Sequence, residues 1–524
     1  MSYRRRATAF LGSWLSTRPV LRYWVRRSID LAGRISTPRL AASLSKRVQQ
    51  MRADGAAATS IGAIAPPHPV RMRVMHLASA PGADERRMAV TGRDPGVRPI
   101  VVCLSHLSPY PPRAGNEYRT HRLLTWMNQR GWDVVLLYCP LSGEDPGEGQ
   151  VLMLAKHYPN LIYVQHGGDI RYRFELPHAA AAVASLQRKV TGDLAAALGE
   201  GPASRTARVI PLLRTFCPDA VIEAMLALDD ALAPRMVLAS YVFMSRGLPL
   251  LRSSALKVID THDVFSTKAA KVLPFGINDS LAMSASEEAD LLSRGDLVLA
   301  IQPDEANELR TIAPGTKVVT VGVDVAMCLA PGASADVPIA LLVGSGNALN
   351  VKGLRDFLRF AWTRVRHAVP DAELHVVGSI GSTLRNDVPG VRRLNFVDDL
   401  SSAYAAARVV INPVVAGTGL KIKTLEALAH LRPIVVWPSG LDGIPMEIRA
   451  LCEAVTDWYA FSEALIRLLR EDERQRLITA ARDQIASYLA PERVYRELER
   501  ELEGISRKGR GELAAAAVGT AIKL

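Results

Sequence analysis

A segment in the C-terminal third carries residues suited to binding a phosphate. Residues 412–429 read NPVVAGTGLKIKTLEALA, in which a predicted strand is followed by Gly417 and Gly419 and then by a helix that begins near Lys421. The free N–H groups and the dipole of a helix N-terminus attract anions, and Lys421 and Lys423 add positive charge. The segment therefore predicts a phosphate site; the alternative is a glycine-rich turn with solvated lysines.

The same predicted helix carries a carboxylate close to that phosphate site. Glu426 follows Lys423 by three residues, so both lie on one face of the helix and Glu426 is one turn further in. A carboxylate there can accept hydrogen bonds from ribose hydroxyls while a diphosphate stays at the helix tip. The pattern favours a nucleotide as the ligand.

Two further groups of polar residues follow predicted strands earlier in the chain. Residues 258–265 read VIDTHDVF, and His262 and Asp263 leave the strand at its carboxyl end. In parallel α/β sheets this end faces the ligand crevice. We expect His262 and Asp263 to face a cleft, with a histidine of the core or of a loop as the alternative.

The loop after the first predicted strand is the other group. Residues 108–137 read SPYPPRAGNEYRTHRLLTWMNQRGWDVVLL, with Gly115 and Asn116 before a helix that Gly131 is expected to end. Arg119 lies in the first turn of that helix. It is interpreted as support for an anion or as a partner of the region around Glu117, with an arginine on the helix surface as the alternative.

Alternating strands and helices place these groups in two α/β units. Residues 219–225, DAVIEAM, are among the segments read as strands of the first unit. We predict two tandem Rossmann-like, doubly wound parallel-sheet domains that face a central cleft. The predicted divisions are an extension and linker over 1–97, a first domain over 98–325, a nucleotide-binding domain over 326–490, and a charged helix and tail over 491–524 that cross back to the first domain.

The net charge of +12 belongs to the extension and not to the two domains. Residues 1–97 hold 17 Lys/Arg and 5 Asp/Glu, whereas the remaining 427 residues hold 47 of each. With a neutral body and no recognition motif, we expect no nucleic-acid partner. Residues 1–50 combine arginines with Trp and Leu at helical spacings, which is typical of a basic helix on an anionic membrane surface; the alternative is a poorly ordered extension.

The cysteines, the apolar runs and one aspartate pair indicate the cellular compartment and whether a metal is bound. The five cysteines are far apart without a CxxC pair, which argues against a zinc site and a disulfide framework and suits a reducing compartment. No apolar run is long enough for a membrane-spanning helix, so we expect a cytoplasmic protein that can lie peripherally on the inner face of the cell membrane. The pair Asp398–Asp399 is read as a helix cap and not as a metal motif.

Residues 417–429, followed by RPIVVWPSGLDGIP over 432–445, resemble the signature of group 1 glycosyltransferases of family 4, which have the GT-B fold. Three further matches follow the family's order, over 341–360, 108–137 and 258–265. The resemblance implies that Glu426 binds the donor ribose, that Lys352 lies against the diphosphate, and that His262 is a catalytic candidate near the transferred sugar. It also places the following residues at the donor: Gly417, Thr418, Gly419, Leu420, Lys421 and Lys423. Thr418 stands where the family has its first glutamate.

The resemblance implies an enzyme that transfers a sugar, with retention, from a nucleoside diphosphate sugar to a glycan or lipid-linked acceptor. A role in bacterial polysaccharide or glycolipid synthesis, without cofactor or metal, would follow. The diphosphate would be stabilised by Lys352, Lys421 and the amides of Gly419 and Leu420. Two alternatives stay open, which are a nucleotide-sugar epimerase of the same fold and a non-catalytic sugar-nucleotide-binding or membrane-associated scaffold protein.

Overall fold

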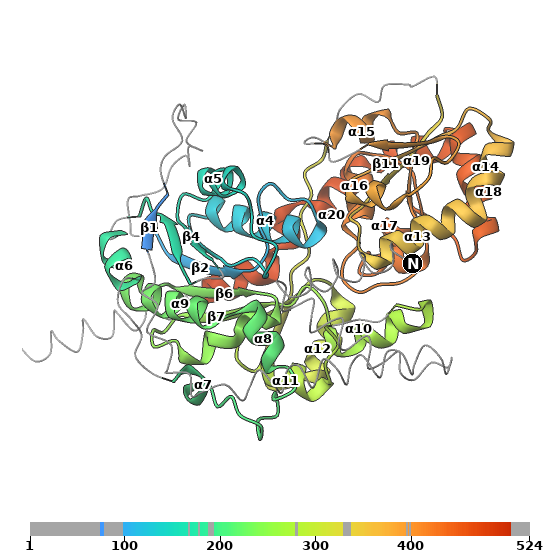
Figure 1. Ribbon diagram of the computed structural model, residues 1–524. Helices are drawn as coiled ribbons and strands as arrows, with labels where there is room; N and C mark the ends of the chain where they lie inside the picture. The colour runs from blue at the N-terminus through green and yellow to red at the C-terminus, as the bar shows by residue number, and fades with distance from the viewer. Residues whose placement is uncertain are drawn as a thin grey trace, which may run out of the picture.

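The computed structural model describes residues 74–77, 98–165, 168–176, 179–186, 193–277, 281–328, 337–394, 397 and 400–504. Figure 1 shows two lobes, each built on a sheet that helices cover. We call them the first lobe (β1–β9) and the second lobe (β10–β15).

The first lobe contains a nine-stranded sheet in the order β1-β5-β4-β3-β2-β6-β7-β8-β9. All neighbours pair in parallel except β4 and β5, which are antiparallel. From β2 the chain first builds β3, β4 and β5 on one side and then β6 to β9 on the other side. Ligand loops are therefore expected to meet between β2 and β6, where the strand order reverses. The strands are β1 (Val74–His76), β2 (Ile100–Ser105), β3 (Asp133–Tyr138), β4 (Leu161–Val164), β5 (Ile170–Arg173), β6 (Met236–Ser240), β7 (Leu256–Asp260), β8 (Leu297–Ala300) and β9 (Lys317–Thr320).

Helices connect these strands, and α4 and α12 are two that bear on the site. The helices are α4 (Gly115–Gln129), α5 (Glu148–His157), α6 (Ala179–Leu186), α7 (Leu194–Ala197), α8 (Ile210–Phe216), α9 (Asp219–Leu232), α10 (Phe265–Val272), α11 (Ala285–Leu292) and α12 (Pro303–Ile312), with the 3₁₀ segments η1 (Val242–Leu250) and η2 (Leu273–Phe275).

The second lobe has a fully parallel six-stranded sheet in the order β12-β11-β10-β13-β14-β15. Numbered within the lobe this is 3-2-1-4-5-6, the order of dinucleotide-binding sheets, in which ligands bind where β10 and β13 diverge. The strands are β10 (Ile339–Val343), β11 (Glu373–Val377), β12 (Val391–Leu394), β13 (Val409–Asn412), β14 (Ile434–Val436) and β15 (Glu453–Ala454).

In the second lobe, α13 follows β10 and α16 follows β13, so both helices begin at the point of divergence. The helices are α13 (Ala348–Phe357), α14 (Thr363–Ala368), α15 (Ser401–Ala406), α16 (Ile422–Ala429), α17 (Met446–Arg449), α18 (Trp458–Arg470), α19 (Glu473–Ala480), α20 (Arg482–Leu489) and α21 (Pro491–Val494), with the π-helical segment η3 (Leu358–Trp362) and the 3₁₀ segments η4 (Ser379–Thr383) and η5 (Pro438–Leu441).

The end of the described chain returns to the first lobe. Residues 496–504 are helical, and Tyr495, Leu498 and Leu502 join the apolar cluster beneath the first sheet. Tyr495 stacks on Trp126 with ring centroids 4.5 Å apart. Because this helix buries apolar side chains against the opposite lobe, it holds the two lobes together.

Two expectations about local structure were wrong. Residues 219–225 lie in helix α9 and not in a strand; Val221, Ile222, Ala224, Met225 and Leu228 are buried at helical spacing, and the apolar run reflects that face. The segment predicted as linker contains strand β1, which pairs with β5 from Val74–Ile170 to His76–Tyr172.

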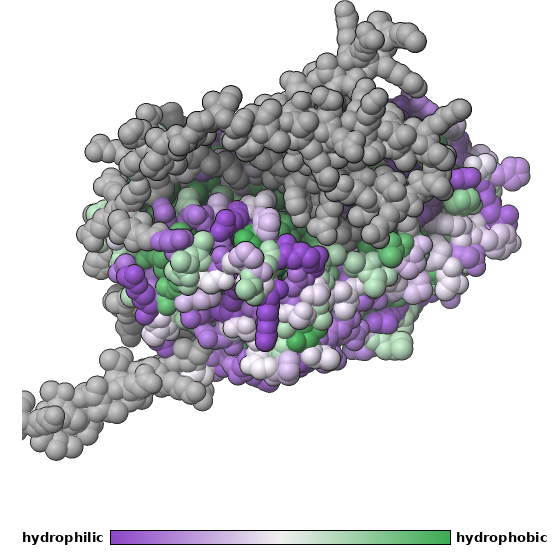
Figure 2. Space-filling model, turned by 60° about the horizontal axis from the view of Figure 1, so that its bottom comes forward, coloured by the Kyte–Doolittle hydropathy of each residue, from purple (hydrophilic) through white to green (hydrophobic). Residues whose placement is uncertain are grey.

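On the face shown in Figure 2, hydrophilic and hydrophobic residues are interspersed over the described part. Among the described residues, none of the helices is both long and apolar enough to cross a bilayer. Residues 1–50, predicted to bind an anionic membrane, lie outside the described residues.

Candidate active site

A cavity of about 980 Å³ lies between the two lobes. It opens where the carboxyl ends of β10 and β13 diverge and faces the ends of β6 and β7. Its volume lies at the upper end of the usual range for small-molecule sites, roughly 300–1,000 Å³. Most residues singled out in the sequence line it: Gly115, Asn116, His262, Asp263, Gly417, Thr418, Gly419, Leu420, Lys421, Lys423 and Glu426.

The glycine loop between β13 and α16 needs a glycine at position 419. Gly419 has φ +75°, and a Cβ there would lie 3.2 Å from the backbone oxygen of His262 in the first lobe. A side chain would therefore be strained by its backbone conformation and would press on the opposite lobe. Gly419 lets the two lobes approach at the loop.

Gly115, in the first lobe, also allows the two lobes to approach closely. It begins α4, and a Cβ on it would lie 3.1 Å from Cδ1 of Ile422, the first residue of α16. The next residue, Asn116, donates from Nδ2 to the hydroxyl of Tyr241 at 3.0 Å. The predicted loop residues thus lie where the first lobe meets the glycine loop.

Lys421, which directly precedes α16, and Lys423, in its first turn, both line the cavity and have partners in the protein. Lys421 donates from Nζ to the backbone oxygens of Thr418 and Gly419, at 2.9 and 2.8 Å. Lys423 donates to Oδ1 of Asn350 at 2.6 Å. Burial lowers the pKa of Lys423 to about 8, with Glu426 partly opposing the shift. The two lysines bring positive charge to the N-terminus of α16.

Glu426 lies one turn further along the helix. Tyr404 donates its hydroxyl to Oε2 of Glu426 at 3.2 Å. Burial raises the pKa of Glu426 to about 7, although the Tyr404 hydrogen bond and the charge of Lys423 oppose it. A carboxyl with this pKa changes its charge near neutrality.

Two hydrogen bonds join the glycine loop to the first lobe. Thr418 donates its hydroxyl to Oδ1 of Asp263 at 2.5 Å, and the N–H of Gly419 donates to Oε1 of Glu305 at 2.6 Å. The expectation that the Gly419 amide contacts a diphosphate therefore does not fit this arrangement, because a carboxylate already occupies it.

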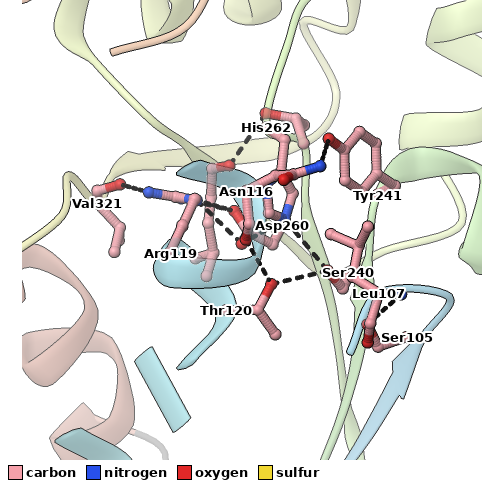
Figure 3. Close-up of polar contacts among 12 residues, drawn as sticks. Ser105, Leu107, Asn116, Arg119, Thr120, Ser240, Tyr241, Asp260, His262 and Val321 are labelled. Carbon is pink, nitrogen blue, oxygen red and sulfur yellow. Dashed lines mark hydrogen bonds and ion pairs between the residues drawn. The ribbon is translucent and has the colours of Figure 1, made fainter. Parts of the chain in front are cut away.

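His262 is held firmly at the end of β7 (Figure 3). Its backbone has φ +59°, and its ring stacks on Tyr241 with centroids 4.2 Å apart and planes 6° apart. Nε2 lies 3.1 Å from Oγ of Ser240 and 3.2 Å from Oδ2 of Asp260. This nitrogen therefore points to the interior, and the residue lines the cavity with a fixed ring.

Arg119 does not serve an external anion. It forms a buried ion pair with Asp260, from Nε at 3.0 Å to each carboxylate oxygen (Figure 3). It also donates to the backbone oxygens of Val321 and Gly322, at 2.6 and 2.7 Å. Burial alone would raise the pKa of Asp260, but Arg119 and His262 outweigh it and hold that pKa well below its usual range. The interpretations from the sequence were anion support, pairing near Glu117 and a surface position, and none of them identified this buried pair with Asp260.

Lys352 also lies apart from the other predicted donor residues. It sits on α13 and donates to Oδ2 of Asp356 at 2.6 Å, one turn along the same helix. It is not among the residues that line the cavity, whereas Ser345, Asn347 and Asn350 at the start of α13 are. The side of α13 that meets the cavity is its N-terminus, capped by Asn347.

Sequence reasoning missed several residues in or beside the site, among them Tyr241, Glu305 and Tyr404. Tyr241, at the end of β6, could have been found from the rule that strand ends face the crevice. Glu305 and Tyr404 carry no such signal, because they lie on α12 and α15 and reach the loop and Glu426 only through folding.

Within the part of the chain that the structure describes, no group of three or more His, Cys, Asp or Glu is arranged to hold a metal ion. Asp398 and Asp399, read as a helix cap, lie outside the described residues.

Known proteins resemble this chain in the sequence of the second lobe and in the fold of both lobes. Residues 337–471 match the family model of glycosyl transferases group 1. Sucrose-phosphate synthase from Thermosynechococcus elongatus has a similar structure (TM-score 0.54, 16% identity, covering 79% of this chain and 100% of that one). So does HepE from Anabaena, solved in complex with UDP and glucose (TM-score 0.51, 12% identity, 78% and 100%). No curated protein sequence matches the chain. The predicted fold, two Rossmann-like domains in the GT-B arrangement, is confirmed.

Proposed function

Since residues 337–471 match the family of glycosyl transferases group 1 and the two lobes have the GT-B fold, we propose that the chain is a glycosyltransferase of this group. It would move a sugar from a nucleoside diphosphate sugar to a glycan or lipid-linked acceptor, with retention at the anomeric carbon. The reaction would serve bacterial polysaccharide or glycolipid synthesis. The single observation that carries the proposal is the placement of Lys421, Lys423 and Glu426 together in the cavity, in the lobe that matches the family.

The nucleotide would lie on the second lobe. Glu426, whose pKa lies near neutrality, would accept hydrogen bonds from the ribose hydroxyls when its carboxyl group is ionised. Lys421, Lys423 and the N-terminus of α13 would attract the diphosphate. HepE was solved with UDP and glucose, which makes a uridine nucleotide the first one to test.

The reaction requires that charge building on the departing diphosphate be stabilised. Lys421 and Lys423 supply that charge at the helix tip, so the proposal needs neither a cofactor nor a metal ion. His262 and Asp263 face the cavity from the first lobe beside the glycine loop, which suits contact with the transferred sugar. We propose His262 as the catalytic candidate. Its Nε2 already faces Ser240 and Asp260, so the residue would contact the transferred sugar through the part of it that lines the cavity.

The acceptor would enter from the first lobe. Tyr110, Pro111, Pro112 and Met153 line that side of the cavity, and such a surface suits the carbon skeleton of a glycan or the apolar part of a lipid-linked sugar. Attachment of residues 1–50 to the inner face of the cell membrane would bring the enzyme to such an acceptor, and this remains a prediction from the sequence.

A thermal-shift screen with UDP, GDP, ADP and dTDP and their glucose derivatives tests the donor site. A ligand that binds only the folded protein raises the melting temperature by mass action. We expect one nucleotide class to stabilise the wild type and to lose its effect in Glu426→Ala and Lys421→Ala. A folded wild type that responds to none of these ligands would contradict the proposal and favour a scaffold protein.

A further inference from the structure

One contact between the lobes has no role in the donor contacts proposed above. Glu305 extends from α12 of the first lobe and accepts the N–H of Gly419 in the donor loop at 2.6 Å. Its side chain is buried, with the residue only 1% exposed. A buried carboxyl that accepts a backbone N–H from another domain fixes that segment strongly, because breaking the bond leaves both groups buried without a partner.

The loop residue that Glu305 holds also orients a lysine of the donor site. Lys421 donates from Nζ to the backbone oxygens of Thr418 and Gly419. The carbonyl of the peptide group that Glu305 binds, and the carbonyl of the next peptide group, therefore determine where the ammonium lies. Moving Gly419 would move the charge that we assign to the diphosphate.

The groups around Glu305 favour the neutral form of its carboxyl group. Oε2 of Glu305 and Oε1 of Gln302 are both buried without a hydrogen-bond partner among the described residues, so acceptors outnumber donors. Burial and the nearby charge of Asp263 raise the pKa of Glu305 to about 7, although Gly419, Gln302 and Lys421 oppose the shift. A neutral glutamine keeps the acceptor for Gly419 and adds a donor.

We propose that Glu305 is a positioning residue for the donor site, which holds the glycine loop and Lys421 in place from the opposite lobe. The proposal rests on the function proposed above and adds that donor affinity depends on a residue of the first lobe. Since Gly419 approaches both His262 and Glu305 of that lobe, the donor site is complete only when the lobes are in contact.

Titration calorimetry of the full chain tests this with Glu305→Ala, Glu305→Gln and the matched control Glu308→Ala. The ligand is the nucleotide that stabilises the wild type most in the screen of UDP, GDP, ADP and dTDP. Glu308 lies on the same helix and accepts hydrogen bonds from Thr267 and Lys271 of its own lobe, at 2.8 and 2.7 Å. Melting temperatures without ligand show that each variant is folded.

We expect Glu305→Ala to raise Kd at least about tenfold, equivalent to about 1.4 kcal/mol, while Glu308→Ala binds like the wild type. Glu305→Gln should restore the affinity to within about threefold of the wild type, as expected for a lost hydrogen bond and not for a general loss of structure.

Three results would overturn the inference while leaving the proposed function intact. They are unchanged affinity in folded Glu305→Ala, failure of Glu305→Gln to restore binding, and tighter binding by Glu305→Ala, which would mean that the carboxylate competes with the donor for the Gly419 amide. If the wild type itself bound none of the nucleotides, the proposed function would fail instead.

Discussion

The hydroxyl of Tyr404 donates to Oε2 of Glu426 at 3.2 Å, and the ring of Tyr404 stacks on His430 with centroids 4.2 Å apart. The stack fixes the ring, and the hydroxyl in turn fixes the carboxylate. One oxygen of Glu426 thus has a protein partner, which orients the group toward a ligand in the cavity. In the proposed enzyme, Tyr404 orients the group that binds the donor ribose.

Removing this hydroxyl should weaken nucleotide binding without unfolding the protein. Tyr404→Phe keeps the ring and its stack but frees the carboxylate of Glu426, at a cost of about 1 kcal/mol for a lost hydrogen bond, or roughly fivefold in Kd. Titration calorimetry measures the change. Tyr459→Phe, on the exposed face of α18, is the matched control; equal effects of the two substitutions would contradict the orienting role.

Nucleotide-sugar affinity should pass through a maximum between about pH 7 and pH 8. Burial raises the pKa of Glu426 to about 7, so the carboxylate that accepts ribose hydroxyls forms only as the pH rises through that value. Burial lowers the pKa of Lys423 to about 8, so its positive charge is lost as the pH rises further. Titrations with UDP-glucose, which has no phosphate monoester to ionise in this range, measure the profile.

The acidic limb of that profile should disappear in Glu426→Gln, because the amide does not change its charge. Overall affinity should fall, since an amide is a weaker acceptor than a carboxylate. An acidic limb that persists unchanged in Glu426→Gln would assign it to another group.

Two lysines suggested by the sequence should differ in their effect on nucleotide binding. Lys421 faces the cavity, so Lys421→Ala should raise Kd about tenfold or more, as expected for the loss of a charged hydrogen bond. Lys352 pairs with Asp356 outside the cavity lining, so Lys352→Ala should stay within about twofold of the wild type. A large effect of Lys352→Ala would restore the role that the resemblance implies.

Arg119 should contribute to stability. Arg119→Ala would remove the arginine from the buried Asp260 carboxylate, and breaking a buried pair in this way costs about 3–5 kcal/mol. Urea unfolding of the full chain, followed by a signal from the first lobe, measures the loss in free energy of unfolding. Arg122, which pairs with Asp324 but is partly exposed, is the comparison, and Arg122→Ala should cost clearly less. A loss below about 1 kcal/mol for Arg119→Ala would contradict this account.

Local sequence patterns predicted much of the fold and part of the site. Gly131 ends α4 in a left-handed conformation, with φ +86°, as its place after the helix indicated. The glycines and lysines at the start of α16 lie in the cavity because a strand, a tight loop and a helix follow each other directly in sequence. Such features are predictable because every partner lies within a few residues.

The remaining features depend on contacts between distant segments. The partner of Arg119 is Asp260, 141 residues away, so the sequence could not show that the charge is neutralised. The Gly419 amide meets Glu305, 114 residues away and in the other lobe. Residues 219–225 resemble a strand because a run rich in apolar residues does not reveal its period over so short a length.

The most direct test of the central claim is to follow the fate of a nucleotide sugar by proton NMR. Wild type and Glu426→Ala would be incubated with the glucose derivative of the nucleotide that stabilises the protein most, with a panel of glycans as acceptors and water as the alternative acceptor. The account predicts that only the wild type releases the nucleoside diphosphate, and that the transferred or hydrolysed sugar first appears with the anomeric configuration of the donor. Release with the opposite configuration would contradict retention, and a wild type that binds the nucleotide without any release would contradict catalysis itself.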